Sequence, residues 1–132
     1  MYKLLIFSTL FFLISCGGGG KKNTAPVLQA IIDINVTEGT TSRLLTFNAT
    51  DEDSDNLTYK ISGVDASNFR LEGNHLFFRT SPDFEIPNDS NLDNKYELEV
   101  SVSDSKAEVS DSFSIIINDA FEGFVIDAPV VG

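Results

Sequence analysis

Residues 96–104 read YELEVSVSD, and this stretch decides the fold class of the chain. Its apolar side chains occupy every second position, at Tyr96, Leu98, Val100 and Val102. Acidic residues and serines fill the positions between them. A period of two places alternate side chains on opposite faces of an extended strand. The stretch therefore predicts a β-strand with one buried face and one solvated face, ending at Asp104.

The same alternation recurs along most of the chain. It is found at Leu28, Ala30 and Ile32, at Leu45, Phe47 and Ala49, at Leu57, Tyr59 and Ile61, and at Phe113, Ile115 and Ile117. Two shorter strands are expected near residues 69–71 and 75–79, joined by a tight hairpin at Gly73 and Asn74, which tolerate a positive φ. About seven strands without a sustained helical repeat predict an all-β fold, an antiparallel β-sandwich. Residues 81–94 form a long polar loop in this interpretation.

The N-terminal residues predict export and lipidation. Lys3 precedes an apolar run over residues 4–14 that is too short to span a bilayer. Residues 13–16 (LISC) and four glycines follow, in an order that resembles the bacterial lipobox. We expect a lipoprotein signal peptide over residues 1–15, a lipidated Cys16, and a flexible linker over residues 16–25. The alternative is an ordinary secretory signal with an incidental cysteine. Cys16 is the single cysteine, so an internal disulfide is excluded.

The charge of the chain restricts its partners. There are 9 basic and 20 acidic residues, a net charge of −11. Loss of Lys3 with the signal peptide would leave 8 basic residues against 20 acidic ones, a net charge of −12. No basic patch for nucleic acid is present in this sequence, and cations or basic partners are favoured. The chain has eleven phenylalanines, and the eight that follow the predicted signal peptide supply apolar surface for a core, which argues against a disordered acidic tail.

An acidic cluster lies in residues 51–55 (DEDSD), directly before a predicted strand. Either water solvates these carboxylates in a turn, or a cation neutralises them. An EF-hand loop does not fit, because Asn56 and Ser62 stand where that loop needs glycine and glutamate. Further acidic or amide residues stand at the ends of predicted elements: Glu38, Asp83, Glu85, Asp104, Asn118 and Asp119. Because strand ends face the two poles of a sandwich, two acidic poles are expected. Asp55, Asp89 and Asp93 could supply additional ligands, but a solvated loop is the preferred interpretation of all three.

Taken in order, several short pieces resemble a cadherin domain, most closely the bacterial cadherin-like domains. The pieces are NTAP (23–26), VTE (36–38), ATDED with NLTY (49–53 and 56–59), DFE (83–85), YELEVSVSD (96–104) and IND (117–119). The resemblance covers residues 23–119 and implies a Greek-key sandwich over residues 26–119, with calcium held between successive domains. Residues 120–132 would be a C-terminal extension or the start of a following domain.

The resemblance also implies the metal ligands. Asp51, Asp53 and Asp104 would form the N-terminal pole. The C-terminal pole would comprise Glu38, Asp83, Glu85, Asn118 and Asp119. The linker departs from the family pattern, because Lys21 and Lys22 stand where acidic residues would help to bind the metal.

The function implied is a calcium-binding adhesion or spacer module of a bacterial surface lipoprotein. Its partners would be a membrane, through Cys16, and a protein or cell surface, with self-association as one form. It would lie in the cell envelope, at the outer membrane or cell surface. The alternative is a non-catalytic carbohydrate- or protein-binding sandwich without calcium, as an accessory domain of a longer protein. That alternative predicts an exposed aromatic platform, for which Phe78 and Phe84 are the candidates. Catalysis is not expected, because His75 is the single histidine, Cys16 is assigned to the anchor, and the spacing of Asp83 and Glu85 gives no evidence of a cleft.

Overall fold

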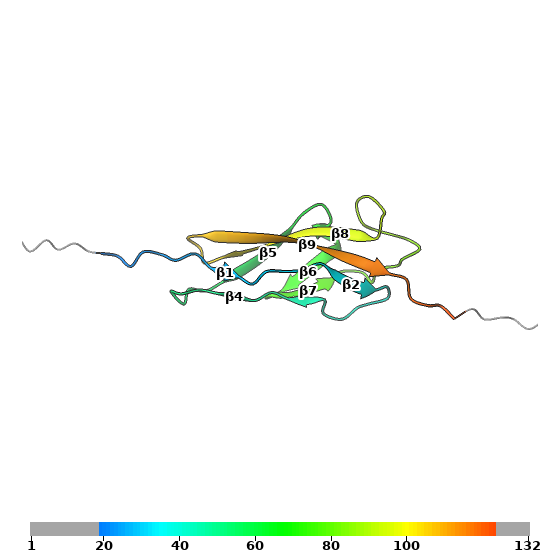
Figure 1. The fold of residues 1–132 in the computed structure, drawn as a ribbon, viewed down its shortest axis with the longest axis horizontal. Coiled ribbons are helices and arrows are strands. Elements are labelled where there is room, and N and C mark those ends of the chain that lie inside the picture. The colour runs from blue at the N-terminus through cyan, green and yellow to red at the C-terminus, as the bar shows by residue number, and fades with distance from the viewer. Residues whose placement is uncertain (1–18, 124–132) are drawn as a thin grey trace, which may run out of the picture.

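The computed structural model describes residues 19–123. The predicted signal peptide, the predicted lipidation site Cys16 and most of the predicted C-terminal extension lie outside these residues. The strands are β1 (Val27–Leu28), β2 (Ile34–Thr37), β3 (Leu45–Thr46), β4 (Ala49–Thr50), β5 (Thr58–Ser62), β6 (Phe69–Glu72), β7 (His75–Phe78), β8 (Lys95–Ser103) and β9 (Glu108–Asn118). A single-turn 3-10 helix, η1 (Ala66–Asn68), precedes β6. The described chain enters and leaves the domain at opposite ends of its long axis (Figure 1).

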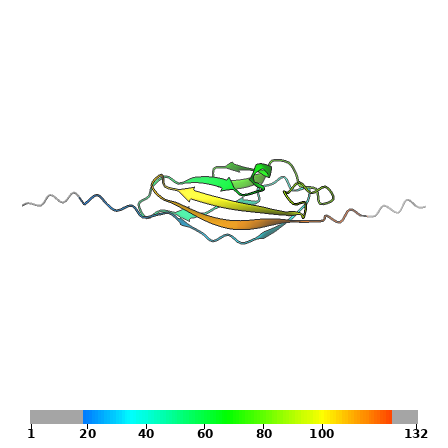
Figure 2. The same ribbon diagram turned by 90° about the horizontal axis from the view of Figure 1, so that it is seen from above.

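The strands form two packed layers, which confirms the predicted all-β sandwich. One sheet has the order β2-β9-β8-β5 and the other has the order β3-β7-β6, while β1 and β4 form a short separate pair. Seen from above, the long strands β8 and β9 run side by side along the domain (Figure 2). All pairings are antiparallel except that of β2 with β9, which is parallel. The element ends therefore gather at two poles.

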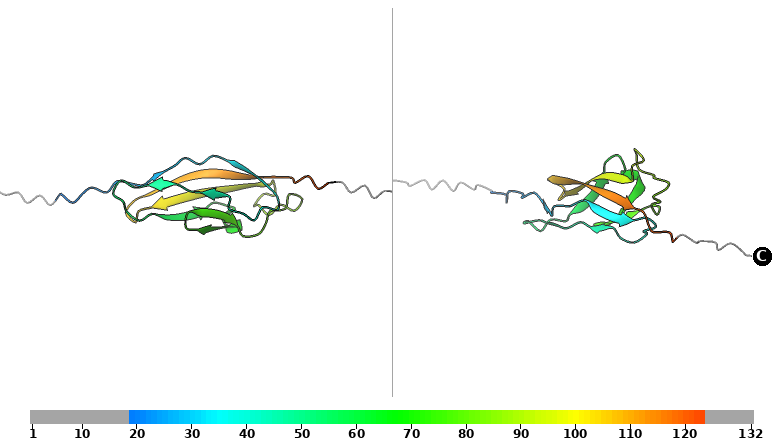
Figure 3. Two further views of the ribbon diagram at one scale, coloured as in Figure 1. Left: turned by 90° about the horizontal axis from the view of Figure 1, so that it is seen from below. Right: turned by 45° about the vertical axis from the view of Figure 1, so that its right-hand side comes forward.

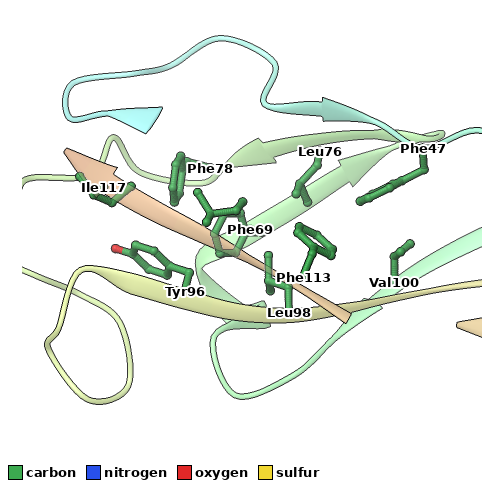
Figure 4. Close-up of a cluster of buried hydrophobic side chains, with 10 residues drawn as sticks. Phe47, Phe69, Leu76, Phe78, Tyr96, Leu98, Val100, Phe113 and Ile117 are labelled. Carbon is green, nitrogen blue, oxygen red and sulfur yellow. The ribbon is translucent and has the colours of Figure 1, made fainter. Parts of the chain in front are cut away.

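The core lies between the two sheets (Figure 4). Every apolar side chain that the alternation of 96–102 and 113–117 placed inward is buried: Tyr96, Leu98, Val100, Val102, Phe113, Ile115 and Ile117. From the opposite sheet and the β3–β4 corner come Phe47, Phe69, Leu76 and Phe78. The rings of Phe69 and Tyr96 meet edge to face, with centroids 5.4 Å apart. Aromatic pairs of this geometry add to the free energy of area burial, and they hold the layers that carry the poles.

The first predicted strand is interrupted, because the chain changes sheets within it. Residues 29–33 are not a strand, and Ile32 is 78% exposed. Across this break the Ile31 N–H donates to Asp111 Oδ2 (2.9 Å), and the Ser114 N–H donates to Asp33 Oδ1 (2.7 Å). Residues before the break pair with β4 and residues after it pair with β9. Between the two pairings, carboxylate oxygens accept the N–H groups that backbone carbonyls would accept in a regular ladder. β2 then runs beside β9 (Figure 3).

The predicted strand over residues 45–49 is also interrupted, between β3 and β4. The Phe47 N–H donates to the Asn74 carbonyl (2.9 Å), and Asn74 Nδ2 donates to the Phe47 carbonyl (2.7 Å). Asn74 belongs to the hairpin between β6 and β7, where Gly73 has φ +63° and Asn74 has a negative φ. A glycine at the first central position is typical of a type II′ hairpin turn. One hairpin residue therefore fastens the corner of a strand far away in sequence.

The polar loop over residues 81–94 is fixed by two buried aspartates. Asp89 is 3% exposed, and its carboxylate accepts the N–H groups of Asp93 (2.9 Å) and Asn94 (3.0 Å). Asp65 is 1% exposed and accepts the N–H groups of Ser90 (2.7 Å) and Glu97 (2.8 Å). The interpretation of Asp89 as a solvated residue is therefore wrong, because its side chain is buried and its oxygens accept backbone N–H groups of the loop. This loop carries Asp83 and Glu85.

Candidate metal centres at the two poles

The N-terminal pole is built on the turn after β4. Asp51 Oδ1 accepts the backbone N–H groups of Asp53 (2.9 Å) and Asp55 (3.1 Å). This Asx-type turn bends the chain back over its own side chain. Carboxylate oxygens of Asp51, Asp53 and Asp55 come within 4.8 Å of one another. A turn of this kind explains how three acidic residues of a short stretch converge on one point.

The incoming linker is docked on this pole. The Thr24 N–H donates to Asp53 Oδ2 (2.7 Å), and Asn23 Nδ2 donates to Asp104 Oδ2 (2.8 Å). Asp104 is 2% exposed, and its Oδ1 accepts the N–H groups of Lys106 (2.7 Å) and Ala107 (2.6 Å). These hydrogen bonds lower the pKa of Asp104, with that from Asn23 the strongest cause. Asp104 thus closes the β8–β9 turn and meets the linker, but it lies outside the three-carboxylate cluster.

Unsatisfied acceptors gather at the same pole. Within residues 19–123, three buried side-chain atoms have neither a hydrogen-bond partner nor an ion-pair partner, and all three are oxygens: Asn23 Oδ1, Asp51 Oδ2 and Asn94 Oδ1. Two of them, Asn23 Oδ1 and Asp51 Oδ2, belong to the N-terminal pole. A buried acceptor without a donor costs free energy unless a water or an ion satisfies it. Acceptors without donors are the ligand type that a hard cation takes.

Two lysines also reach this pole. Lys21 Nζ lies 2.6 Å from Asp53 Oδ1, and Lys106 Nζ lies 2.6 Å from Asp55 Oδ2. Contact with Lys21, followed by the Thr24 hydrogen bond, lowers the pKa of the Asp53 carboxyl. The same ion pairs raise the pKa of Lys21 and of Lys106. Asp55 is therefore a half-buried member of the cluster with its own ion pair, and not the freely solvated loop residue expected from sequence.

The C-terminal pole is organised by Glu38, which follows β2. Its Oε2 accepts the Phe84 N–H and its Oε1 accepts the Ala120 N–H, both at 2.8 Å. These two hydrogen bonds lower the pKa of the Glu38 carboxyl. The Glu38 N–H in turn donates to the Asn118 carbonyl (3.0 Å). One side chain thus joins the fixed loop and the segment that leaves β9.

Glu38, Glu85 and Asp119 form the second carboxylate cluster, with oxygens within 4.8 Å of one another. A backbone hydrogen bond favours the charged form of Glu85, but burial and the charges of Glu38, Asp119 and Asp83 outweigh it and raise the pKa of Glu85. Asp83 stands beside the cluster, where its Oδ1 accepts the Ile86 N–H (2.8 Å). Asn118 contributes a backbone carbonyl to Glu38. Among the described residues, no lysine or arginine forms an ion pair with these acids.

Sequence reasoning missed two contributors to the N-terminal pole. Asn23 was seen only as part of the linker, although its side chain contacts Asp104 and leaves Oδ1 unsatisfied. Lys106 was not considered, because its partner Asp55 is far away in sequence. Asn23 has a sequence signal, since an amide side chain precedes the linker proline at Pro26. The pairing of Lys106 with Asp55 requires the register of β8 with β5, which the sequence does not state.

The comparisons with known proteins agree with this architecture. Human protocadherin-24 EC1-2 matches 74% of this chain with a TM-score of 0.60 and 24% identity, over 44% of its own length. Drosophila N-cadherin EC1-4 matches 73% with a TM-score of 0.61 and 15% identity, over 25% of its length. The human desmocollin-1 ectodomain matches 77% with a TM-score of 0.57 and 17% identity, over 20% of its length. The fold is cadherin-like.

The similarity to cadherins was found by comparing structures and not by comparing sequences. No protein-family model and no curated protein matches the sequence. This chain spans less than half the length of the cadherin fragments named above. No helix among residues 19–123 is long and apolar enough to cross a membrane.

Phe78 and Phe84, the two candidates for an exposed aromatic platform, do not form such a surface. Phe78 is 7% exposed and stacks in the core against Phe69, with ring centroids 4.6 Å apart. Phe84 is half-buried and packs against the same core. A sugar-binding surface of the kind that stacks flat rings on exposed aromatics would need other residues.

Proposed function

We propose that this chain is a calcium-binding adhesion or spacer module of a bacterial surface lipoprotein. The two unsatisfied buried oxygens at the N-terminal pole, Asn23 Oδ1 and Asp51 Oδ2, carry this proposal, because cation ligation is the chemistry they fit. The cadherin-like fold adds weight, since both acidic clusters lie at its poles. At the N-terminal pole, Asp51, Asp53 and Asp55 would hold the ion together with Asn23 Oδ1. At the C-terminal pole, Glu38, Glu85 and Asp119 would hold it.

Bound calcium would neutralise these carboxylates and fasten the segments that carry them. Each cluster supplies three carboxylates, whereas calcium takes six to eight oxygens. Waters, backbone carbonyls or a neighbouring domain would complete each shell. The poles lie at opposite ends of the long axis (Figure 1), so such modules would join end to end. The isolated chain should then bind calcium weakly, on the order of 1 mM.

Thermal unfolding of the purified protein tests the calcium proposal. With a Kd on the order of 1 mM, about 10 mM calcium would stabilise the native state by about 1.4 kcal/mol per site, roughly 5–10 °C in Tm. Chelator should abolish the rise, and magnesium should not reproduce it. Asp51→Asn/Asp53→Asn should remove the part due to the N-terminal pole, and Glu85→Gln/Asp119→Asn the rest. Glu52→Gln is the matched control, because Glu52 is exposed in the same turn and outside the cluster. An unchanged Tm in calcium would contradict the proposal.

Lipidation at Cys16 places the module on a membrane in this proposal. The motif of residues 13–16 supports it. Expression of the full chain in a bacterium, followed by membrane fractionation and mass spectrometry of the N-terminus, tests it. We expect the wild type in the membrane fraction and the Cys16→Ser variant in the soluble fraction. An unmodified cysteine in the exported wild type would leave the ordinary secretory signal as the correct interpretation.

The module would act by contacting a protein or another cell surface. Self-association would supply such a partner, and sedimentation velocity with and without calcium measures it directly. A monomer in both conditions would exclude self-association as the mode of adhesion for this chain.

A further inference from the structure

We propose that Lys21 is a built-in counter-ion that competes with calcium for the N-terminal pole. Calcium binding there would displace the Lys21 ammonium group and release the start of the linker. The inference rests on the proposed function, because it concerns how the same site is regulated.

The geometry places one ammonium group on an atom that a metal would use. Among the described residues, the Lys21 ammonium group is the single partner of Asp53 Oδ1, and the Asp53 side chain is only 10% exposed. Lys21 Nζ stands 2.6 Å from this oxygen. The two unsatisfied oxygens of this pole, on Asn23 and Asp51, have no such neighbour among the described residues. A cation at Asp53 Oδ1 and the Lys21 ammonium group would therefore exclude each other.

The Lys21 ammonium group can leave Asp53 at little cost in free energy, whereas the Asp53 carboxylate is costly to leave without a positive partner. The Lys21 side chain is 76% exposed, so water solvates it fully once it is released. Exposed ion pairs are weak because they gain little Coulomb energy and lose side-chain entropy. A largely buried carboxylate, by contrast, loses solvation and needs a positive partner. Lysine binding is then strong enough to balance Asp53 in the absence of calcium, and weak enough to yield to a divalent ion.

Lys106 balances the same cluster from the opposite side, through Asp55. Its backbone is fixed in the β8–β9 turn, where its N–H donates to Asp104. Lys21 lies on the linker before the first strand, and its release would change the freedom of that linker. Thr24 and Asn23 would still hold the linker to Asp53 and Asp104. Among the described residues, displacement therefore loosens only residues 19–22.

Isothermal titration calorimetry with calcium chloride tests the competition. The titrations use the protein carrying Glu85→Gln/Asp119→Asn, so that only the N-terminal pole retains its carboxylates. Lys21→Gln in this background should lower the calcium Kd about twofold to fivefold. Lys22→Gln is the matched control: it removes the same charge one residue away, and within residues 19–123 Lys22 forms no ion pair. Its Kd should stay close to that of the parent.

A second measurement follows the lysine itself. In the ¹H–¹³C spectrum of the parent, the Lys21 Cε resonance should shift with the same calcium dependence as the heat of binding, while that of Lys22 stays unchanged. Equal tightening by Lys21→Gln and Lys22→Gln would show a general charge effect and overturn the competition. An unchanged Kd in Lys21→Gln would also overturn it, while leaving calcium binding intact. Absence of calcium binding in the parent and in both variants would overturn the calcium site itself.

Discussion

The two poles each gather three carboxylates, but they balance the charge in different ways. At the N-terminal pole, Lys21 and Lys106 pair with two of the three acids. At the C-terminal pole, backbone N–H groups satisfy Glu38, while Glu85 faces other carboxylates and its pKa is raised. Both poles thus hold three carboxylates, but only the N-terminal pole has lysine side chains that neutralise part of the charge. The C-terminal pole should depend more strongly on an external ion.

The largest effect should come from Asp65, which holds the loop that carries Glu85. Asp65→Ala removes a buried carboxylate that accepts the Ser90 and Glu97 N–H groups, and we expect a loss of about 2–4 kcal/mol in the free energy of unfolding. Urea denaturation measures it. In the folded variant, stabilisation by calcium should fall mainly at the C-terminal pole. Asp93→Ala, in the exposed part of the same loop, should cost far less. A loss similar to that of Asp93→Ala would show that the loop is not held by Asp65.

A smaller effect is expected from Glu38. Glu38→Ala leaves the N–H groups of Phe84 and Ala120 without their acceptor, and Tm in chelator should fall by about 5 °C. The folded pKa of Glu38 lies below its unfolded value, so its stabilisation is present above the unfolded pKa and is lost as pH falls through the folded pKa. The difference between wild type and variant should therefore vanish in acid. Melting curves across acidic pH check this, and a difference that persists at low pH would contradict it.

The smallest effect has the opposite sign. The folded pKa of Glu85 lies above its unfolded value, so its charge destabilises the native state at neutral pH. Glu85→Gln should raise Tm in chelator by about 1–3 °C. The gain should disappear as pH falls below the unfolded pKa, where both states are protonated. In calcium the order should reverse, because the variant loses a ligand. A lower Tm for Glu85→Gln in chelator at neutral pH would show that the Glu85 charge does not destabilise the native state. The two poles would then not differ in how well their charge is balanced.

The sandwich could be predicted because its signal is local. Burial on one face of β8 and β9 imposes a period of two on the sequence, and Leu98 or Ile115 shows it without knowledge of any partner. The breaks in the two first predicted strands could not be seen in this way. They depend on Asp33, Asp111 and Asn74, polar residues whose oxygens and amides replace ladder bonds from far away in sequence.

The candidate sites were predictable only in part, for a related reason. Acidic residues at strand ends must lie at a pole. Asp51 and Asp53 were therefore expected at one pole and Glu38 and Glu85 at the other, and the structure places them so. Their detailed roles depend on side-chain contacts across the fold. Asp104 is occupied by a turn and by Asn23, and the pairing of Lys21 with Asp53 spans the linker. Such contacts depend on tertiary packing between residues far apart in the chain, and they produce no repeating pattern in the sequence.

The parallel pairing of β2 with β9 has a mechanical consequence. These two strands lead toward opposite ends of the chain, and four residue pairs join them, from Ile34 with Ile115 to Thr37 with Asn118. Tension applied between the two ends of the domain therefore runs along the strands and across their slanted hydrogen bonds. The bonds must then yield together in shear and cannot open one by one like a zipper. A domain pulled at its two poles would resist force where β2 meets β9, its last strand.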